Sequence, residues 1–279
     1  MSEEMRHLRR RIVAIPTQET EIMGILLTPE RPGCRAGLLW IHGGGYAAGM
    51  PSMLYVSMGR KIAKKFGAVV LSPGYRLSGE APYPAALNDC YAALKWMDSR
   101  KEELGIDRIM VGGESAGGGL TAALCMLAHD RGEVNISYQF PLYPMLDCED
   151  TESSRNNRGF FWNTRRNHAA WKMYLKGVDP VPAYASPARR EDYHGLPPCY
   201  TFVLKGEPFY AETLRYVRNL QEAGVEAAAD VYPGKTHGFD LMMPCAPKSL
   251  KAHAVLMDHF RQALEQDAAP PGRFPADRT

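Results

Sequence analysis

The segment 110–120 constrains the fold more than any other part of the chain. A short apolar run, residues 109–111, leads into a Gly-x-Ser-x-Gly pattern centred on Ser115, and a stretch rich in alanine and leucine follows. This order predicts a buried strand, a tight turn and a helix. Glycines on both sides of Ser115 remove the Cβ atoms that would clash, so the turn can hold the serine in a strained backbone conformation with its hydroxyl exposed. The helix that follows directs its free N–H groups toward the same place.

Composition indicates a globular chain and excludes several classes of function. The 279 residues are 45% hydrophobic, which suffices for one large domain with a substantial core. The 33 basic and 31 acidic residues leave a formal net charge of +2, which gives no support for a nucleic-acid groove or an acidic partner. No apolar run approaches the roughly 18–20 residues of a membrane span. No signal peptide is visible either, so we expect a cytoplasmic protein.

Apolar strands and helical patterns alternate along most of the chain. Buried strands are predicted over residues 38–41, 68–71, 107–111, 136–140, 200–204 and 227–232. Helices are predicted over residues 52–66, 84–100, 120–130, 212–223 and 247–266, and an edge hairpin over 12–15 and 21–27. This alternation predicts an α/β fold with a mostly parallel central sheet and helices on both faces.

The alternation breaks over about residues 145–198. This segment has little strand pattern, contains the aromatic run Phe160, Phe161 and Trp162, and includes one predicted helix. A long insertion here is either a surface excursion or a lid over a site, and the aromatic run favours the lid. We therefore expect a single domain over 1–279 with cap elements from about 1–20 and 145–198. The proline-rich end, 268–279, is predicted to be a frayed tail.

Side chains suited to nucleophilic catalysis follow the predicted strands. A serine nucleophile needs a base that takes its proton and an acid that orients this base. His237 follows the last predicted strand and is the candidate base, whereas most other histidines lie in charged or helical stretches. Glu207 follows the strand over 200–204 and is the candidate acid. The competing carboxylates are Glu114, Glu212 and Asp240.

Backbone amides are the candidate donors for a developing oxyanion. Gly43 and Gly44 follow the strand over 38–41, and Ala116 directly follows the serine. His42 precedes these glycines, and we interpret it as a side chain that props their loop by hydrogen bonds. No metal-ligand spacing is present and the six cysteines form no C-x-x-C pair, so we expect no cofactor.

Three motifs together resemble the hormone-sensitive-lipase-like family of α/β-hydrolase esterases. They are His-Gly-Gly-Gly at 42–45, Gly-Glu-Ser-Ala-Gly-Gly at 113–118 and His-Gly-Phe at 237–239. With weaker matches between them, the resemblance spans roughly residues 37–260. It implies the α/β-hydrolase fold and the chemistry of a serine esterase that needs no cofactor.

The resemblance also implies roles for individual residues. Ser115, Glu207 and His237 match the catalytic triad of the family, and the oxyanion donors carry over as Gly43, Gly44 and Ala116. The family usually has aspartate where this chain has Glu114 and Glu207. The part before Ile12 is shorter than the usual cap helices, which implies an open, shallow acyl pocket for small acyl groups or bulky alcohols.

The expected function is hydrolysis of short-chain carboxylic esters, acetyl to butyryl-like, through an acyl-enzyme. An amidase or formamidase, a sugar or xylan-type deacetylase, and a non-catalytic ligand-binding protein of the same fold remain as alternatives. The candidate substrate-binding residues are Phe160, Phe161, Trp162 and Phe209. The expected partner is a small-molecule ester, with no nucleic acid and no membrane. The last strand and helix are a common pairing edge in this family and predict a homodimer.

Overall fold

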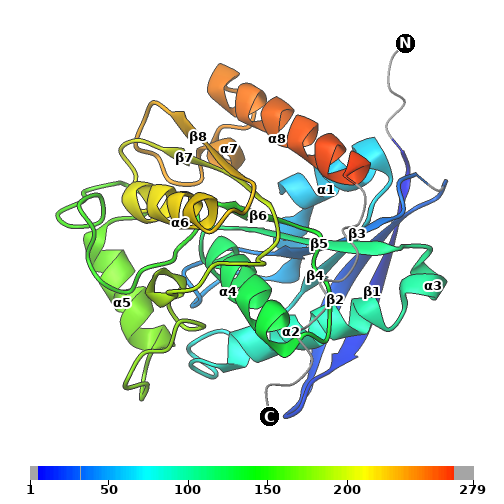
Figure 1. The fold of residues 1–279 in the computed structure, drawn as a ribbon, viewed down its shortest axis with the longest axis horizontal. Helices are drawn as coiled ribbons and strands as arrows, with labels where there is room; N and C mark the ends of the chain where they lie inside the picture. Colours follow the sequence, from blue (N-terminus) through cyan, green and yellow to red (C-terminus); the bar gives the residue numbers. More distant parts are fainter. Residues whose placement is uncertain (1–5, 32, 267–279) are drawn as a thin grey trace.

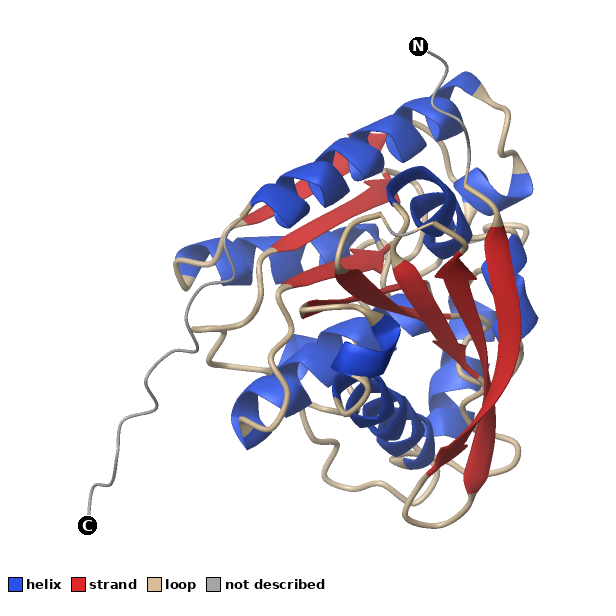
Figure 2. Cartoon of the chain, turned by 90° about the vertical axis from the view of Figure 1, so that its right-hand side faces the viewer, coloured by secondary structure: helices blue, strands red, loops and turns tan. Residues whose placement is uncertain are grey.

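The computed structural model describes residues 6–31 and 33–266. Its centre is an eight-stranded sheet with the order β1-β2-β4-β3-β5-β6-β7-β8. The strands are β1 (Leu8–Pro16), β2 (Glu21–Pro29), β3 (Ala36–Ile41), β4 (Val69–Pro73), β5 (Arg108–Glu114), β6 (Tyr138–Leu142), β7 (Cys199–Leu204) and β8 (Ala227–Tyr232). The pairs β1–β2 and β2–β4 are antiparallel and the others are parallel. The predicted mostly parallel sheet is confirmed, and it is visibly twisted (Figure 2).

Helices cover both faces of this sheet. They are α1 (Met58–Phe66), α2 (Ala85–Asp98), α3 (Lys101–Leu104), α4 (Ala116–Arg131), α5 (Thr164–Tyr174), α6 (Tyr210–Glu222), α7 (Phe239–Met242) and α8 (Pro247–Glu265), with 3₁₀ turns η1 (Pro51–Tyr55) and η2 (Pro187–Arg189). Figure 1 shows α1 and α8 on one side of the sheet and α2 and α4 on the other. The buried side chains divide in the same way, because α2 and α4 share one apolar cluster and α1 and α8 share another.

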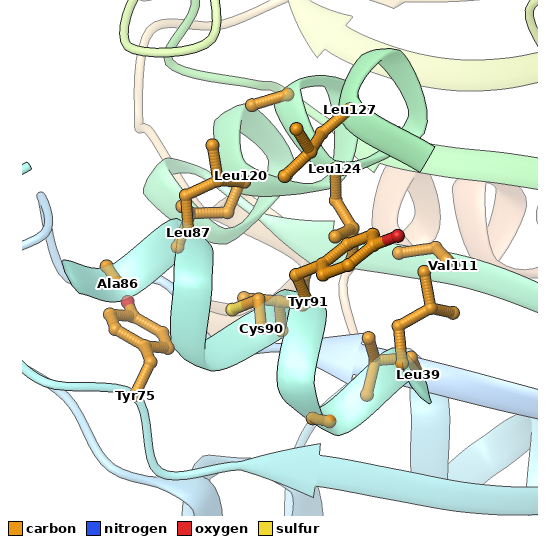
Figure 3. Close-up of a cluster of buried hydrophobic side chains, with 14 of the residues drawn as sticks. Leu39, Tyr75, Ala86, Leu87, Cys90, Tyr91, Val111, Leu120, Leu124 and Leu127 are labelled. Carbon is orange, nitrogen blue, oxygen red and sulfur yellow. The ribbon is translucent and has the colours of Figure 1, made fainter. Parts of the chain in front are cut away.

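The helix that follows Ser115 is buried all round. Every residue of α4 from Ala116 to Ala128 is buried, and Figure 3 shows its leucines packed against α2 and the sheet. Glycines allow this close approach. A Cβ on Gly117 would lie 2.1 Å from the carbonyl oxygen of Ile41, and a Cβ on Gly119 would lie 2.2 Å from that of Met145.

The N-terminal part differs from the expected cap. The predicted cap over about 1–20 is wrong for residues 8–16, which form β1 and pair with β2 along nine positions. The reason is a strand pattern, because Val13 and Ile15 are buried whereas residues 9–12 and Ala14 are exposed. The predicted edge hairpin is confirmed. Residues 1–5 and the predicted tail over 268–279 lie outside the described residues.

Smaller differences concern helix boundaries. The helix predicted over 52–66 is divided into η1 and α1, because the Ser57 hydroxyl caps α1 by accepting a hydrogen bond from the N–H of Gly59. The segment between β6 and β7 contains α5 and η2. Among the described helices, none has the length and apolar character needed to cross a membrane.

Candidate active site

Ser115 occupies a sharp turn between β5 and α4. Its backbone has φ 56° and ψ −119°, a strained conformation for a residue with a side chain, as the glycine spacing predicts. A Cβ on Gly113 would lie 2.5 Å from the carbonyl oxygen of Ile41, so glycine is required there. The last residue of β6 and the loop after it hold this turn from both sides. The Ser115 N–H donates to the carbonyl of Leu142, and the Met145 N–H donates to the carbonyl of Ser115, both at 3.0 Å.

His237 and Glu207 reach this serine from two other loops. Glu207 follows β7 and His237 follows β8, at the same end of the sheet. His237 Nε2 lies 2.8 Å from the Ser115 Oγ, and His237 Nδ1 lies 2.5 Å from Glu207 Oε2. The fully buried Glu207 also accepts a hydrogen bond from the Leu204 N–H at 2.8 Å. Because a carboxylate only accepts, the imidazole proton lies on Nδ1, and Nε2 is free to accept from the serine.

The glycine loop after β3 lies against the same turn. A Cβ on Gly43 would be 3.2 Å from the Cβ of Ser115, and Gly44 has φ +123°, which favours glycine. Within the described part of the chain, the N–H groups of Gly43 and Gly44 donate no hydrogen bond. Ala116 begins α4, so its N–H has no acceptor within the helix. These three N–H groups are therefore available to a ligand.

His42 supports this loop. Its ring stacks on Tyr75 with centroids 4.2 Å apart, and its Nδ1 lies 2.8 Å from the carbonyl oxygen of Gly43. Burial lowers the pKa of His42 from 6.5 to about 4, so the ring is neutral at neutral pH. A neutral ring that donates from Nδ1 fits the predicted supporting role.

Comparison with known proteins identifies the family. A family model described as the alpha/beta hydrolase fold matches residues 38–241. The chain belongs to this α/β-hydrolase family. The resemblance to α/β-hydrolase esterases predicted from the motifs is therefore confirmed.

Named relatives of this α/β hydrolase are esterases. The carboxylesterase NlhH of Mycobacterium tuberculosis is 31% identical over 224 residues, covering 76% of this chain and 70% of the relative. The ethyl acetate hydrolase of Pseudomonas putida is 30% identical over 235 residues, covering 82% and 74%. The solved structure of a bacterial heroin esterase aligns with a TM-score of 0.88 and 34% identity, covering 92% of this chain and 84% of that one. This α/β hydrolase is an enzyme of the carboxylesterase type.

The competing carboxylates have other partners. Both oxygens of Glu114 accept from the indole N–H of Trp40 at 2.9 Å. Glu212 accepts from two backbone N–H groups of the loop after β6, and Asp240 accepts from the Tyr143 hydroxyl at 2.8 Å. Burial raises the pKa of Glu114 and of Glu212 well above the usual range. The carboxylate that hydrogen bonds to the candidate base is that of Glu207.

Two of the four predicted aromatic residues lie at the triad. The buried Phe209 ring meets the His237 ring edge to face, with centroids 5.0 Å apart. The Trp162 ring is 6.3 Å from the same imidazole. Trp162 also lies over the glycine loop, because a Cβ on Gly45 would be 2.2 Å from its Cη2 atom. The indole therefore connects the segment 145–198 to both the glycine loop and the candidate base.

The other two aromatic residues are not brought to the triad. Phe160 is 84% exposed and Phe161 is 39% exposed, and their rings contact each other. Both are neighbours of Trp162 in sequence, but only the third side chain of this run turns inward.

Tyr143 is a further contact of the candidate base, and the sequence motifs do not identify it. Its buried ring meets the His237 ring edge to face, with centroids 5.2 Å apart. The available signal is its position directly after β6, because Glu207 and His237 also follow strands at this end of the sheet.

Proposed function

We propose that this α/β hydrolase cleaves carboxylic esters with short acyl groups, acetyl to butyryl-like, through a Ser-His-Glu triad. Ser115 is the nucleophile, His237 the general base and Glu207 the acid that orients the imidazole. The observation that carries this proposal is the continuous line of two hydrogen bonds, 2.8 Å from serine to imidazole and 2.5 Å from imidazole to carboxylate.

The reaction follows from this geometry. Ser115 Oγ attacks the ester carbonyl carbon while its proton passes to His237 Nε2, and the ionised Glu207 stabilises the imidazolium without taking the proton. The backbone N–H groups of Gly43, Gly44 and Ala116 stabilise the negative oxygen of the tetrahedral intermediate. When the C–O bond breaks, His237 gives its proton to the leaving alcohol. Water then attacks the acyl-serine with the same base, which releases the carboxylic acid and restores the enzyme.

The preference for short acyl groups rests on the crowding of the site. The rings of Trp162 and Phe209 lie against the candidate base, and we propose that the segment 145–198 is the cap that bears the first of these rings. The name of the Pseudomonas relative, ethyl acetate hydrolase, also supports small ester substrates.

A p-nitrophenyl ester series from acetyl to decanoyl tests this proposal. We expect turnover to be highest with acetyl to butyryl esters and to fall by about 10³-fold or more in Ser115→Ala. A fluorophosphonate probe should label the wild-type protein at Ser115. Full turnover by Ser115→Ala would contradict the assignment of the nucleophile, and failure of the probe to react would favour the non-catalytic alternative. Anilides, formamides and acetylated sugars in the same series separate the amidase and deacetylase alternatives.

We also propose a homodimer that pairs through β8 and α8. The strand β8 lies at the edge of the sheet, and its Val231 is 43% exposed. Light scattering coupled to size-exclusion chromatography should give twice the mass of the chain, and a monomeric mass at all concentrations would contradict this pairing.

A further inference from the structure

A buried hydrogen bond outside the triad connects two of its loops. The Tyr143 hydroxyl donates to Asp240 Oδ1 at 2.8 Å, and each residue is 1% exposed. The backbone of Tyr143 is strained, with φ 34°, and its N–H donates to the carbonyl of Phe202 in β7 at 3.1 Å. The surrounding structure therefore fixes this tyrosine in a conformation that tyrosine does not favour.

The two ends of this bond lie next to the two reacting side chains. On one side, Tyr143 lies between Leu142 and Met145, whose backbone groups hold Ser115 by its N–H and its carbonyl. On the other side, Asp240 lies in α7, directly after the loop that bears His237. The bond thus joins the segment that holds the nucleophile to the segment that bears the base.

Two basic side chains lie near this hydrogen bond. Burial, together with Asp240 and Glu114, holds the pKa of the Tyr143 hydroxyl well above its usual range, so this group stays a donor. The second oxygen of Asp240 is buried and has no hydrogen-bond partner, and His253 Nε2 lies 3.7 Å from it. The Lys61 amine lies 3.0 Å from His253 Nδ1 and 3.5 Å from His253 Nε2.

We propose that Tyr143 and Asp240 are positioning residues for the general base. Their hydrogen bond sets the distance between the His237 loop and the Ser115 turn, and the perpendicular contact between the Tyr143 ring and the imidazole restrains the tilt of the imidazole. This inference rests on the proposed function, since it takes His237 as the base. Neither residue hydrogen bonds to a triad side chain, so both act through the placement of His237 relative to Ser115.

Tyr143→Phe tests this role, because it removes the hydroxyl and keeps the ring. We expect kcat to fall about tenfold with KM nearly unchanged, the size of effect that one charge-assisted hydrogen bond supports. The rate at which a fluorophosphonate modifies Ser115 should fall by a similar factor. The matched control is Tyr216→Phe, which removes an equally short 2.8 Å hydrogen bond from a buried tyrosine to Gln139, away from the triad. This control should lose similar thermal stability and keep its kcat.

Substitutions of Asp240 give a second, independent test of the positioning role. Asp240→Asn keeps an oxygen that accepts from the Tyr143 hydroxyl, whereas Asp240→Leu branches at the same atom, is larger and has no acceptor. We expect kcat to fall less in the asparagine variant than in the leucine variant, and the leucine variant to lose at least as much as Tyr143→Phe.

The outcomes separate this inference from the proposed function. A wild-type kcat and a wild-type phosphonylation rate in folded Tyr143→Phe would overturn the positioning role, while the inactivity of Ser115→Ala would leave the triad intact. Equal losses of kcat in Tyr143→Phe and Tyr216→Phe would also overturn it, because they would indicate a general loss of stability. A wild-type protein inert to both esters and phosphonate would overturn both proposals.

Discussion

Replacing Glu207 by glutamine should remove nearly all ester hydrolysis, although the side chain keeps its size. The carboxylate accepts two hydrogen bonds, from the Leu204 N–H at 2.8 Å and from His237 at 2.5 Å. A carboxamide has one acceptor oxygen and one NH₂ group. If the oxygen stays with Leu204, the NH₂ group faces His237 Nδ1 and donates to it. The imidazole proton then moves to Nε2, which is left unable to accept the serine proton.

The opposite orientation of the amide does not rescue the enzyme. It places the NH₂ group against the Leu204 N–H, and two buried donors without acceptors cost about 1–3 kcal/mol each. The orientation with the wrong tautomer satisfies both partners and is therefore favoured. We expect kcat to fall by about 10³–10⁴, which corresponds to about 4–5 kcal/mol in the activation barrier.

The assay is turnover of p-nitrophenyl butyrate together with thermal unfolding of each variant. Glu212→Gln is the matched control, because Glu212 is equally buried and receives both of its hydrogen bonds at one oxygen, which the amide retains. It should keep most of the wild-type kcat. A folded Glu207→Gln variant within tenfold of the wild-type kcat would show that the carboxylate does not set the tautomer of His237.

Two other predictions concern the glycine loop. Gly45→Ala should lower both kcat/KM and the melting temperature, because the new Cβ would lie 2.2 Å from the Trp162 ring at a φ of +60°. If adding Trp162→Ala to this variant recovers none of the loss, the contact with the indole is not its cause. The free energy of unfolding should fall by about 3 kcal/mol as the pH is lowered from 6.5 to 4. The buried His42 has a pKa of about 4, whereas in the unfolded chain its pKa is 6.5, so the unfolded state takes up the proton first. Urea unfolding across this pH range should show a flatter profile for His42→Gln, and an unchanged profile would refute this origin.

The sequence predicts the parts of the site that depend on local pattern. The turn at Ser115 follows from glycine spacing, because Gly113 and Gly117 have no room for a Cβ. His237 and Glu207 can be found because each follows an apolar strand, and parallel strands bring their carboxyl ends to one edge. The order of strands and helices follows from the same alternation.

Features that depend on long-range packing are not predictable in this way. Phe160, Phe161 and Trp162 are adjacent aromatic residues, and only packing over Gly45 decides that the third faces the triad. The role proposed for Tyr143 arises from a hydrogen bond to a residue 97 positions away. Residues 12–15 are predicted as a strand of the edge hairpin, whereas the extension of β1 back to Leu8 is not, because the residues 9–11 are exposed arginines without an apolar alternation.

The close packing of α4 limits how this enzyme can evolve. A methyl group added at Gly117 or Gly119 would lie within about 2.2 Å of a backbone carbonyl oxygen. The first turn of α4, directly after the nucleophile, therefore tolerates almost no substitution. New substrate ranges are therefore expected to arise elsewhere, and the segment 145–198 offers exposed positions such as Phe160 and Phe161. Libraries for altered selectivity should be concentrated in that segment, and α4 should be left unchanged.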